Sequence, residues 1–334
     1  MLTPRENFLE TIKTDGKPDR LVNQWEPIVV ARPEPTLTYL RKGIERGKTA
    51  VDPWGVTFHW PEDQPAAAPW HTPERIVIKE ITAWKKSVKM PDFMSNCTDW
   101  AEAEKIADSI DRNQYLVGAA LSFGLFERAH GLMGFEDTLV NMLLEPEAFG
   151  ELLDLLLEER MILTEMKIDH LKPDIMISHD DWGTKTSLFM SPDTWRDLFK
   201  PRYKKLYDYM HSRGVIVLHH ADCYLEPIVA EMAEIGVDVW QGALMTNNIP
   251  ALQEQLAGRL TLMGGMDTAA LDRPAPENEI RAATRASCAL YGPGGHFIPG
   301  NTYGAPNSMI HPEVEAIVSD AIAEYNEDVY GIRA

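Results

Sequence analysis

Cysteine is scarce in this chain, which has only three in 334 residues: Cys97, Cys223 and Cys288. Three cysteines cannot form a disulfide framework, because at least one of them must stay unpaired. The first twenty residues are charged from the start and contain no apolar core of a secretory signal. Both features predict a protein of the reducing cytoplasm rather than a disulfide-stabilised secreted domain.

Long apolar runs and an excess of basic residues are absent too. No window approaches about 18 uncharged apolar residues, so no segment is predicted to cross a membrane. Lys and Arg total 32 against 51 Asp and Glu, which gives a formal net charge of −19. A charge of this sign disfavours binding to nucleic acid or to anionic membrane surfaces.

Several familiar catalytic motifs are missing as well. The sequence contains no GxSxG elbow, no kinase motif set, no HExxH and no CxxC. The glycines at 264–265 and 292–295 match neither GxGxxG nor a P-loop, and we interpret them as turn residues. Four common enzyme classes and the standard phosphate-binding loops therefore lose support.

Short apolar runs instead alternate with longer amphipathic stretches, which is typical of βα units around a parallel sheet. The predicted strands are residues 22–29, 115–122, 175–181, 215–222, 237–243, 260–267 and 296–301. The predicted helices are residues 3–14, 135–144, 146–170, 191–212, 224–234, 249–256 and 277–290. In the first helix, Thr3 and Glu6 fit a capping box.

Seven or eight such units without a break in composition predict an α/β fold, a single (β/α)8 TIM barrel that spans residues 1–334. Residues 1–110 would form an irregular N-terminal extension together with the first barrel elements, including a short hairpin in the Pro- and Trp-rich stretch at 51–70. A doubly wound open sheet is the competing architecture.

Polar residues follow most of the predicted strands at their carboxyl ends, where a barrel keeps its active site. The set comprises Glu127, His179, Asp180, Asp181, Trp182, His220, Asp222, Gln241, Asp267, Asn301 and Tyr303. A single polar residue after a strand is often only a helix cap. A row of them at one end of the sheet favours a functional mouth.

The strongest local cluster is His219-His220-Ala221-Asp222-Cys223. Residues two apart on a strand point the same way, so His220 and Asp222 are predicted to share the inner face while His219 points into the helix layer. Imidazole and carboxylate together suit a divalent metal such as zinc, which needs at least a third ligand. A His–Asp hydrogen bond that orients substrate is the alternative.

The second cluster is His179-Asp180-Asp181. Its carboxylates could ligate a cation, hold a proton or bind a hydroxylated or cationic substrate, or simply cap the following turn. We predict Asp181 and Glu127 as catalytic beside His220 and Asp222. The predicted substrate-binding residues are His179, Asp180, Trp182, Gln241, Asp267 and Tyr303.

The order of motifs resembles the uroporphyrinogen decarboxylase superfamily over nearly the whole chain. The segments that carry the resemblance are DPWG at 52–55, FER at 126–128 with LMG at 132–134, HDDWG at 179–183, VIVLHHADCYLEPIVAEMAEIGVDVWQ at 215–241, and LTLMGGMDTAALDR at 260–273 with YGPGGHFIPGN at 291–301. The resemblance implies a (β/α)8 barrel, in agreement with the pattern of strands and helices.

Two chemistries occur in that superfamily, and the resemblance favours one of them. The arginine-rich segment with which true uroporphyrinogen decarboxylases hold porphyrinogen carboxylates is not found here. The other branch comprises corrinoid-dependent methyltransferases, in which a His-x-Cys and a later Cys bind zinc. His220 falls on the family histidine, while Asp222 and Asn301 stand where the two cysteines would be, and Cys223 replaces a usual glycine.

The resemblance therefore implies a methyltransferase that moves a methyl group from a small ether, amine or thioether to or from a corrinoid protein. The implied zinc ligands are His220, Asp222, Asn301 and Cys223, with metal or acid assistance at His220 and Asp222. The implied partners are a small-molecule methyl donor or acceptor, a protein that carries the corrinoid, and a second copy in a homodimer. The alternatives are a decarboxylase of a porphyrinogen or other polycarboxylate, and a barrel that binds a ligand without catalysis.

Overall fold

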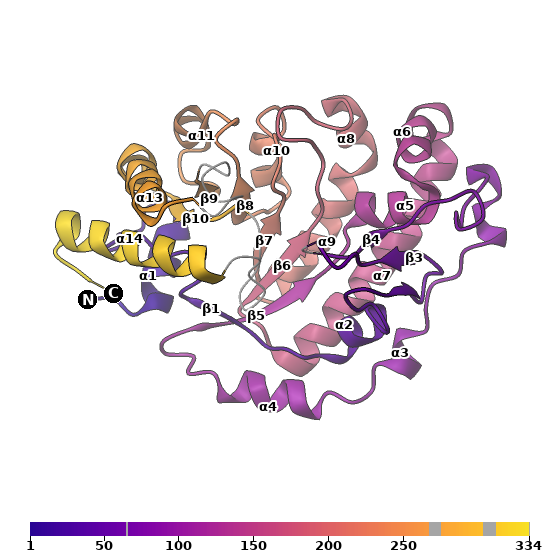
Figure 1. Ribbon diagram of the computed structural model, residues 1–334, viewed down its shortest axis with the longest axis horizontal. Helices are drawn as coiled ribbons and strands as arrows, with labels where there is room; N and C mark the ends of the chain where they lie inside the picture. The colour runs from indigo at the N-terminus through magenta and orange to yellow at the C-terminus, as the bar shows by residue number, and fades with distance from the viewer. Residues whose placement is uncertain (65, 267–274, 303–311, 334) are drawn as a thin grey trace.

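The computed structural model describes residues 1–64, 66–266, 275–302 and 312–333 (Figure 1). Its centre is a curled sheet of seven parallel strands in the order β1-β5-β6-β7-β8-β9-β10. The strands are β1 (Ile28–Val30), β5 (Leu116–Leu121), β6 (Ile175–His179), β7 (Ile216–His220), β8 (Val239–Ala243), β9 (Thr261–Gly265) and β10 (Phe297–Gly300). This order never reverses, as a doubly wound sheet would require, so the competing architecture is excluded.

All seven predicted strands are present, although most are shorter than expected. The described residues provide seven strands rather than the eight of a complete (β/α)8 barrel, and the fold is compatible with that class. The first strand begins only at Ile28, because Glu26 donates a backbone hydrogen bond to Asn23, and Ile28 donates one to Trp25. These bonds form turns in the segment that was predicted to be extended.

Every strand of the sheet contributes to one inner apolar cluster, which shows that the sheet curls around it. The cluster contains Phe8, Val22, Trp25, Ile28, Val30, Leu116, Ile175, Ile177, Leu218, Val239, Met263 and Ile298. The intervening strand residues face outward and pack with the helices in a larger core. The sheet therefore has an apolar interior closed at one end and a polar mouth at the other.

Helices cover the outer face of the sheet (Figure 1). They are α5 (Leu125–Met133), α6 (Phe135–Leu144), α7 (Pro146–Leu171), α8 (Pro192–Leu198), α9 (Lys200–Ser212), α10 (Val229–Glu234), α11 (Ile249–Leu256), α13 (Glu277–Tyr291) and α14 (Pro312–Tyr330), with a 3-10 turn η2 (Gly292–Gly294). The predicted helix 191–212 is two helices. Pro201 cannot donate a backbone hydrogen bond, so the first helix ends and a second helix begins after Phe199.

The first hundred residues hold more regular structure than the sequence indicated. They contain α1 (Pro4–Ile12), α2 (Pro35–Leu40), η1 (Ile81–Lys86), α3 (Phe93–Asn96) and, just after them, α4 (Ala101–Ser109). The expected hairpin is part of an antiparallel sheet of β2 (Thr49–Val51), β3 (Thr57–His59) and β4 (Ala68–Pro69). This small sheet lies beside α5 and β5 (Figure 1), close to the mouth of the large one.

Helices α1 and α14 hold the N-terminal segment against the sheet. The predicted capping box at Thr3 and Glu6 is present, and α1 places Phe8 in the inner cluster at the amino ends of the strands. On α14, Asn326 exchanges two hydrogen bonds with the backbone of Leu21. Asn301, after β10, donates its backbone N–H to Gln24 Oε1 at 3.4 Å. Residues 21–24 therefore connect the last strand with the first.

Candidate functional site

Three neighbouring strands place His179, His220 and Gln241 side by side at the mouth. The register of the sheet pairs His179 with His220, and His220 with Gln241. Ile177, Leu218 and Val239 lie two residues earlier on the same strands and belong to the inner cluster. Because side chains on a strand alternate in direction, the three polar residues face the interior above that cluster.

His179, Asp181 and His220 form a group that can hold a metal ion. One nitrogen from each histidine and one carboxylate oxygen of Asp181 all lie within 4.8 Å of one another. No other group of three histidine, cysteine, aspartate or glutamate side chains in the described part of the chain meets this spacing. Two imidazoles and a carboxylate are a donor set that suits zinc and other divalent first-row metals.

Gln241 sets the protonation of the His220 ring. Its amide nitrogen donates to the backbone oxygens of Asn301 at 3.0 Å and Thr302 at 3.2 Å, so its Oε1 must face His220 Nδ1. An amide oxygen only accepts, so Nδ1 carries the proton and Nε2 keeps its lone pair. Burial and the charge of His179 lower the pKa of His220 to about 4, which agrees with a neutral ring.

Carboxylates surround His179. Its Nε2 atom lies 3.5 Å from Glu127 Oε1 and 3.6 Å from Asp181 Oδ2, and is a buried nitrogen without a hydrogen bond to any described residue. Burial alone would lower the pKa of His179, but the charges of Glu127 and Asp181 raise it to about 10. Burial raises the pKa of Glu127 to about 7, although the charge of His179 acts to lower it. The close approach and charge of His179 outweigh burial and lower the pKa of Asp181 to about 2.

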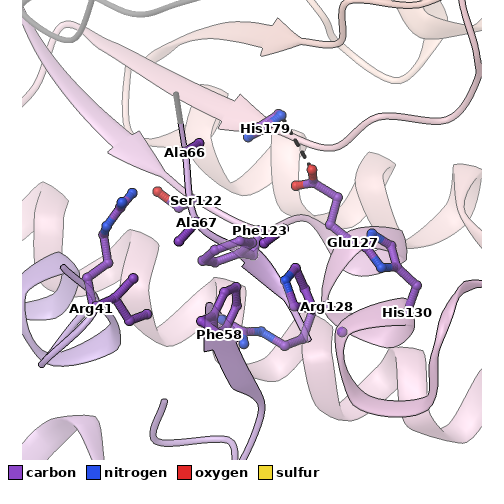
Figure 2. Close-up of a pocket in the computed structure, with 14 residues that line it drawn as sticks. Arg41, Phe58, Ala66, Ala67, Ser122, Phe123, Glu127, Arg128, His130 and His179 are labelled. Atoms are coloured by element: carbon purple, nitrogen blue, oxygen red, sulfur yellow. Dashed lines mark ion pairs between the residues drawn. The ribbon is translucent and has the colours of Figure 1, made fainter. Parts of the chain in front are cut away.

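A cavity of about 290 Å³ opens beside this cluster. Figure 2 shows Glu127 and His179 on one side of it and Arg41 on the other, with Phe58 and Phe123 between them. Its complete lining is Arg41, Ile44, Phe58, Ala66, Ala67, Ala68, Pro69, Ser122, Phe123, Glu127, Arg128, His130, Gly131 and His179. The walls come from the small antiparallel sheet, the end of β5 and α5, so most of the surface is apolar while one end touches the candidate metal group.

Asp180 and Trp182, two of the predicted substrate-binding residues, lie away from this cavity. Both are fully buried behind the strand, and Asp180 accepts four hydrogen bonds. The donors are the backbone N–H groups of Phe126 and Glu127, the Trp182 indole and the Tyr203 hydroxyl. Asp180 therefore anchors the start of α5 and positions Glu127, and no oxygen is free for substrate.

His219 points outward, as predicted. It is fully buried, stacks on Trp182 and pairs through Nδ1 with the Tyr207 hydroxyl at 2.8 Å. Burial lowers the pKa of His219 to about 3, so the ring is neutral. This histidine belongs to the packing between sheet and helices.

The remaining predicted ligands lie in other surroundings. Cys223 is buried in the outer core, where burial raises the pKa of its thiol. The Asn301 amide donates to Glu315 Oε1 at 2.7 Å. Asp222 donates its backbone N–H to Asp181 Oδ1 at 3.0 Å, and burial followed by the charge of Asp181 raises its carboxyl pKa to about 7. Asp267 and Tyr303, predicted to bind substrate, lie outside the described residues.

Sequence reasoning missed most of the cavity. Arg41, Phe58 and His130 come from segments that carry no strand-end signal, namely the residues after α2, the small sheet and the middle of α5. Burial lowers the pKa of His130 to about 4, so a neutral imidazole lines the wall. Only the packing of the N-terminal third onto the mouth brings these residues to the site.

Comparison with known proteins assigns the family. Residues 51–322 match the family model described as Uroporphyrinogen decarboxylase (URO-D), which is most of the chain. The chain therefore belongs to the uroporphyrinogen decarboxylase family, as its motifs predicted. Among solved structures, it is similar to a methyltransferase from Methanosarcina mazei, with a TM-score of 0.69, 16% identity, and coverage of 97% of this chain and 99% of that one. No curated protein sequence matched the chain.

Among the described residues, no helix is long and apolar enough to cross a membrane.

Proposed function

We propose that this protein is a methyltransferase that moves a methyl group from a small ether, amine or thioether to or from a corrinoid carried by a partner protein. The observation that carries the proposal is the continuity of the apolar cavity with the candidate metal group, because His179 belongs to both. The family assignment and the likeness in fold to a methyltransferase support it.

His179, Asp181 and His220 are the residues that would hold a divalent metal, most simply zinc. The donor set fits, since the His220 Nε2 lone pair is free and His179 Nε2 has no hydrogen-bond partner among the described residues. The metal would supply Lewis acidity at the leaving heteroatom, and a Co(I) corrinoid would supply the electron pair that takes the methyl group. Asp222 and Asn301, which replace the family cysteines, then lie outside the set of metal ligands.

The chain's own residues bind and orient the substrate. The apolar walls around Phe58 and Phe123 exclude water from the carbon skeleton. The Glu127 carboxyl group lines the cavity beside His179, where it can hold or release a proton at Oε1 as the heteroatom departs. Gln241 keeps the His220 ring in one tautomer, and Asp180 fixes the backbone at Glu127.

The size of the cavity among the described residues favours this proposal over porphyrinogen decarboxylation. At about 290 Å³ it lies just below the roughly 300–1,000 Å³ typical of pockets for drug-sized ligands. A tetrapyrrole with its carboxylate side chains needs far more room, whereas a molecule of about ten heavy atoms fits.

The experiment is a methyl-transfer assay with the zinc-supplemented protein, free cob(I)alamin and a panel of methylated ethers, amines and thioethers. Formation of methylcobalamin is followed by its visible spectrum. We expect one class of donor to react, and His220→Ala to lose about 100-fold or more of that rate, because the loss of a metal ligand removes several kcal/mol of Lewis-acid stabilisation. A rate that survives in His220→Ala, or no reaction with any donor, would contradict the proposal.

Lys204→Gln is the matched control. Lys204 lies on the exposed face of α9, where it pairs with Asp208 of the same helix. Its removal changes one charge on the surface without touching the mouth, so the methyl-transfer rate of this variant should equal that of the wild type.

A further inference from the structure

The far end of the cavity contains a positive charge that nothing in the described part of the chain neutralises. Arg41 lines the cavity on the side opposite Glu127 (Figure 2). Its guanidinium makes no hydrogen bond or ion pair with another described residue. Elsewhere in the described residues, Arg196, Arg213 and Arg281 pair with carboxylates, while Arg46 and Arg259 donate to backbone oxygens.

Arg32, which follows β1, stands near Arg41 and is also incompletely satisfied. Its Nε atom is buried and has no hydrogen-bond partner among the described residues. The nearest acid, Glu34, is already occupied, because its carboxylate accepts from Lys167 Nζ at 2.6 Å and from Thr36. Burial lowers the pKa of both arginines, while the charge of Glu34 raises that of Arg32 and the charge of Arg41 lowers it. The two guanidiniums repel each other, and an anion from outside the chain that pairs with the exposed Arg41 side chain offsets this repulsion.

We propose that Arg41, supported by Arg32, binds the carboxylate of the substrate, so that the methylated molecule is an anion with its carboxylate at Arg41 and its methylated heteroatom at His179 and Glu127. The apolar middle of the cavity, with Phe58 and Phe123, suits a flat or aliphatic skeleton between these two polar ends. This inference rests on the proposed function for the identity of the methylated end. It disfavours cationic donors that carry no carboxylate, whose charge Arg41 would repel.

A binding experiment tests the charge requirement without metal, corrinoid or turnover. Calorimetry or tryptophan fluorescence would compare 4-methoxybenzoate with the neutral 4-methoxybenzamide, and 3-methoxypropionate with 3-methoxypropionamide, on the full chain. We expect the carboxylate of at least one pair to bind about tenfold or more tightly than its amide, since a charge-assisted hydrogen bond contributes roughly 1.5–3 kcal/mol. Arg41→Gln should abolish this preference, and Arg32→Gln should reduce it.

Lys42→Gln provides the matched control, because Lys42 is the next residue along, is exposed and does not line the cavity. It removes the same charge at nearly the same place, so a preference lost equally in both variants would indicate only a diffuse field and would overturn the proposal. Equal affinity for acid and amide, or failure of every carboxylate to bind the wild type, would also overturn it. These outcomes are separate from failure of methyl transfer, which needs the metal and the corrinoid.

Discussion

At the scale of single residues, the chemistry depends on which nitrogen of a histidine carries a proton. His220 would be an ambiguous ligand if its ring could exchange tautomers. Gln241 removes that ambiguity, because its amide is held in one orientation by the backbone of Asn301 and Thr302. A second residue that fixes a ligand in this way is a common feature of metal sites and typically changes metal affinity about 10–100-fold when it is removed.

Gln241→Met should therefore weaken metal binding by about 10–100-fold while leaving the fold intact, since methionine has a similar volume but no strong acceptor for the His220 N–H. Zinc affinity measured by competition with a chromophoric chelator checks this. Gln241→Glu keeps an acceptor oxygen and should retain more affinity than Gln241→Met. If the two variants bind zinc equally well, the tautomer argument is wrong.

Residue-scale patterns also show how far the sequence could predict the site. The inward direction of His220 and the outward direction of His219 follow from alternation along a strand, and the structure confirms the direction of His219. The same rule, applied to 179–181, separates His179 and Asp181 from the buried Asp180. Arg41 and His130 could not be predicted, because their place in the cavity depends on how distant segments pack and not on any local period.

At the scale of elements, α5 is the part of the molecule that links the mouth to the cavity. It carries Glu127, Arg128 and His130 on one side of the cavity. Its first turn is held by Asp180, which accepts from two backbone N–H groups of the helix as well as from Trp182 and Tyr203. A carboxylate at a helix N-terminus satisfies donors that the helix itself cannot, and its charge suits the helix dipole.

Asp180→Asn should destabilise the protein by about 2–4 kcal/mol. The amide nitrogen of the new asparagine is itself a donor, so it could not accept from the groups that now donate to the Asp180 carboxylate. Chemical denaturation with urea measures the difference. Asp108→Asn, at an exposed position on α4, is the control and should stay within about 0.5 kcal/mol of the wild type. A wild-type stability for Asp180→Asn would show that this anchor does not hold α5.

The contact between α9 and the start of β8 gives a pH-dependent contribution to stability. His211 Nε2 lies 2.8 Å from Asp238 Oδ2, and this hydrogen bond raises the pKa of His211 above its usual 6.5. The charged ring is favoured in the folded state. Its stabilisation is fully present below about pH 6.5 and is lost as the pH rises through the raised native pKa.

Urea unfolding at a series of pH values checks this contribution with His211→Gln as the comparison. The wild type should exceed the variant by up to about 1 kcal/mol below pH 6.5, since the side chains are partly exposed, and the difference should shrink at higher pH. A difference that grows with pH would contradict the sign of the shift.

At the scale of the whole molecule, the regular rhythm of the sequence predicts most of the architecture. The seven strands and most helices of the predicted barrel appear in sequential, parallel order, because alternating buried runs and amphipathic stretches have a single compact arrangement. The N-terminal third could not be predicted in the same way. Apart from α1, its short elements acquire their shape only by packing on the large sheet and its helices, as the small sheet does beside α5.

The central claim is that His179, Asp181 and His220, rather than Asp222, Asn301 and Cys223, hold the metal. The most direct measurement is the zinc content, by mass spectrometry, of protein purified without chelator, for the wild type, Asp181→Ala, His220→Ala and Asp222→Ala. We predict close to one zinc per chain in the wild type and Asp222→Ala, and little in the other two. Absence of metal from every preparation, or loss in Asp222→Ala with retention in Asp181→Ala, would contradict the account.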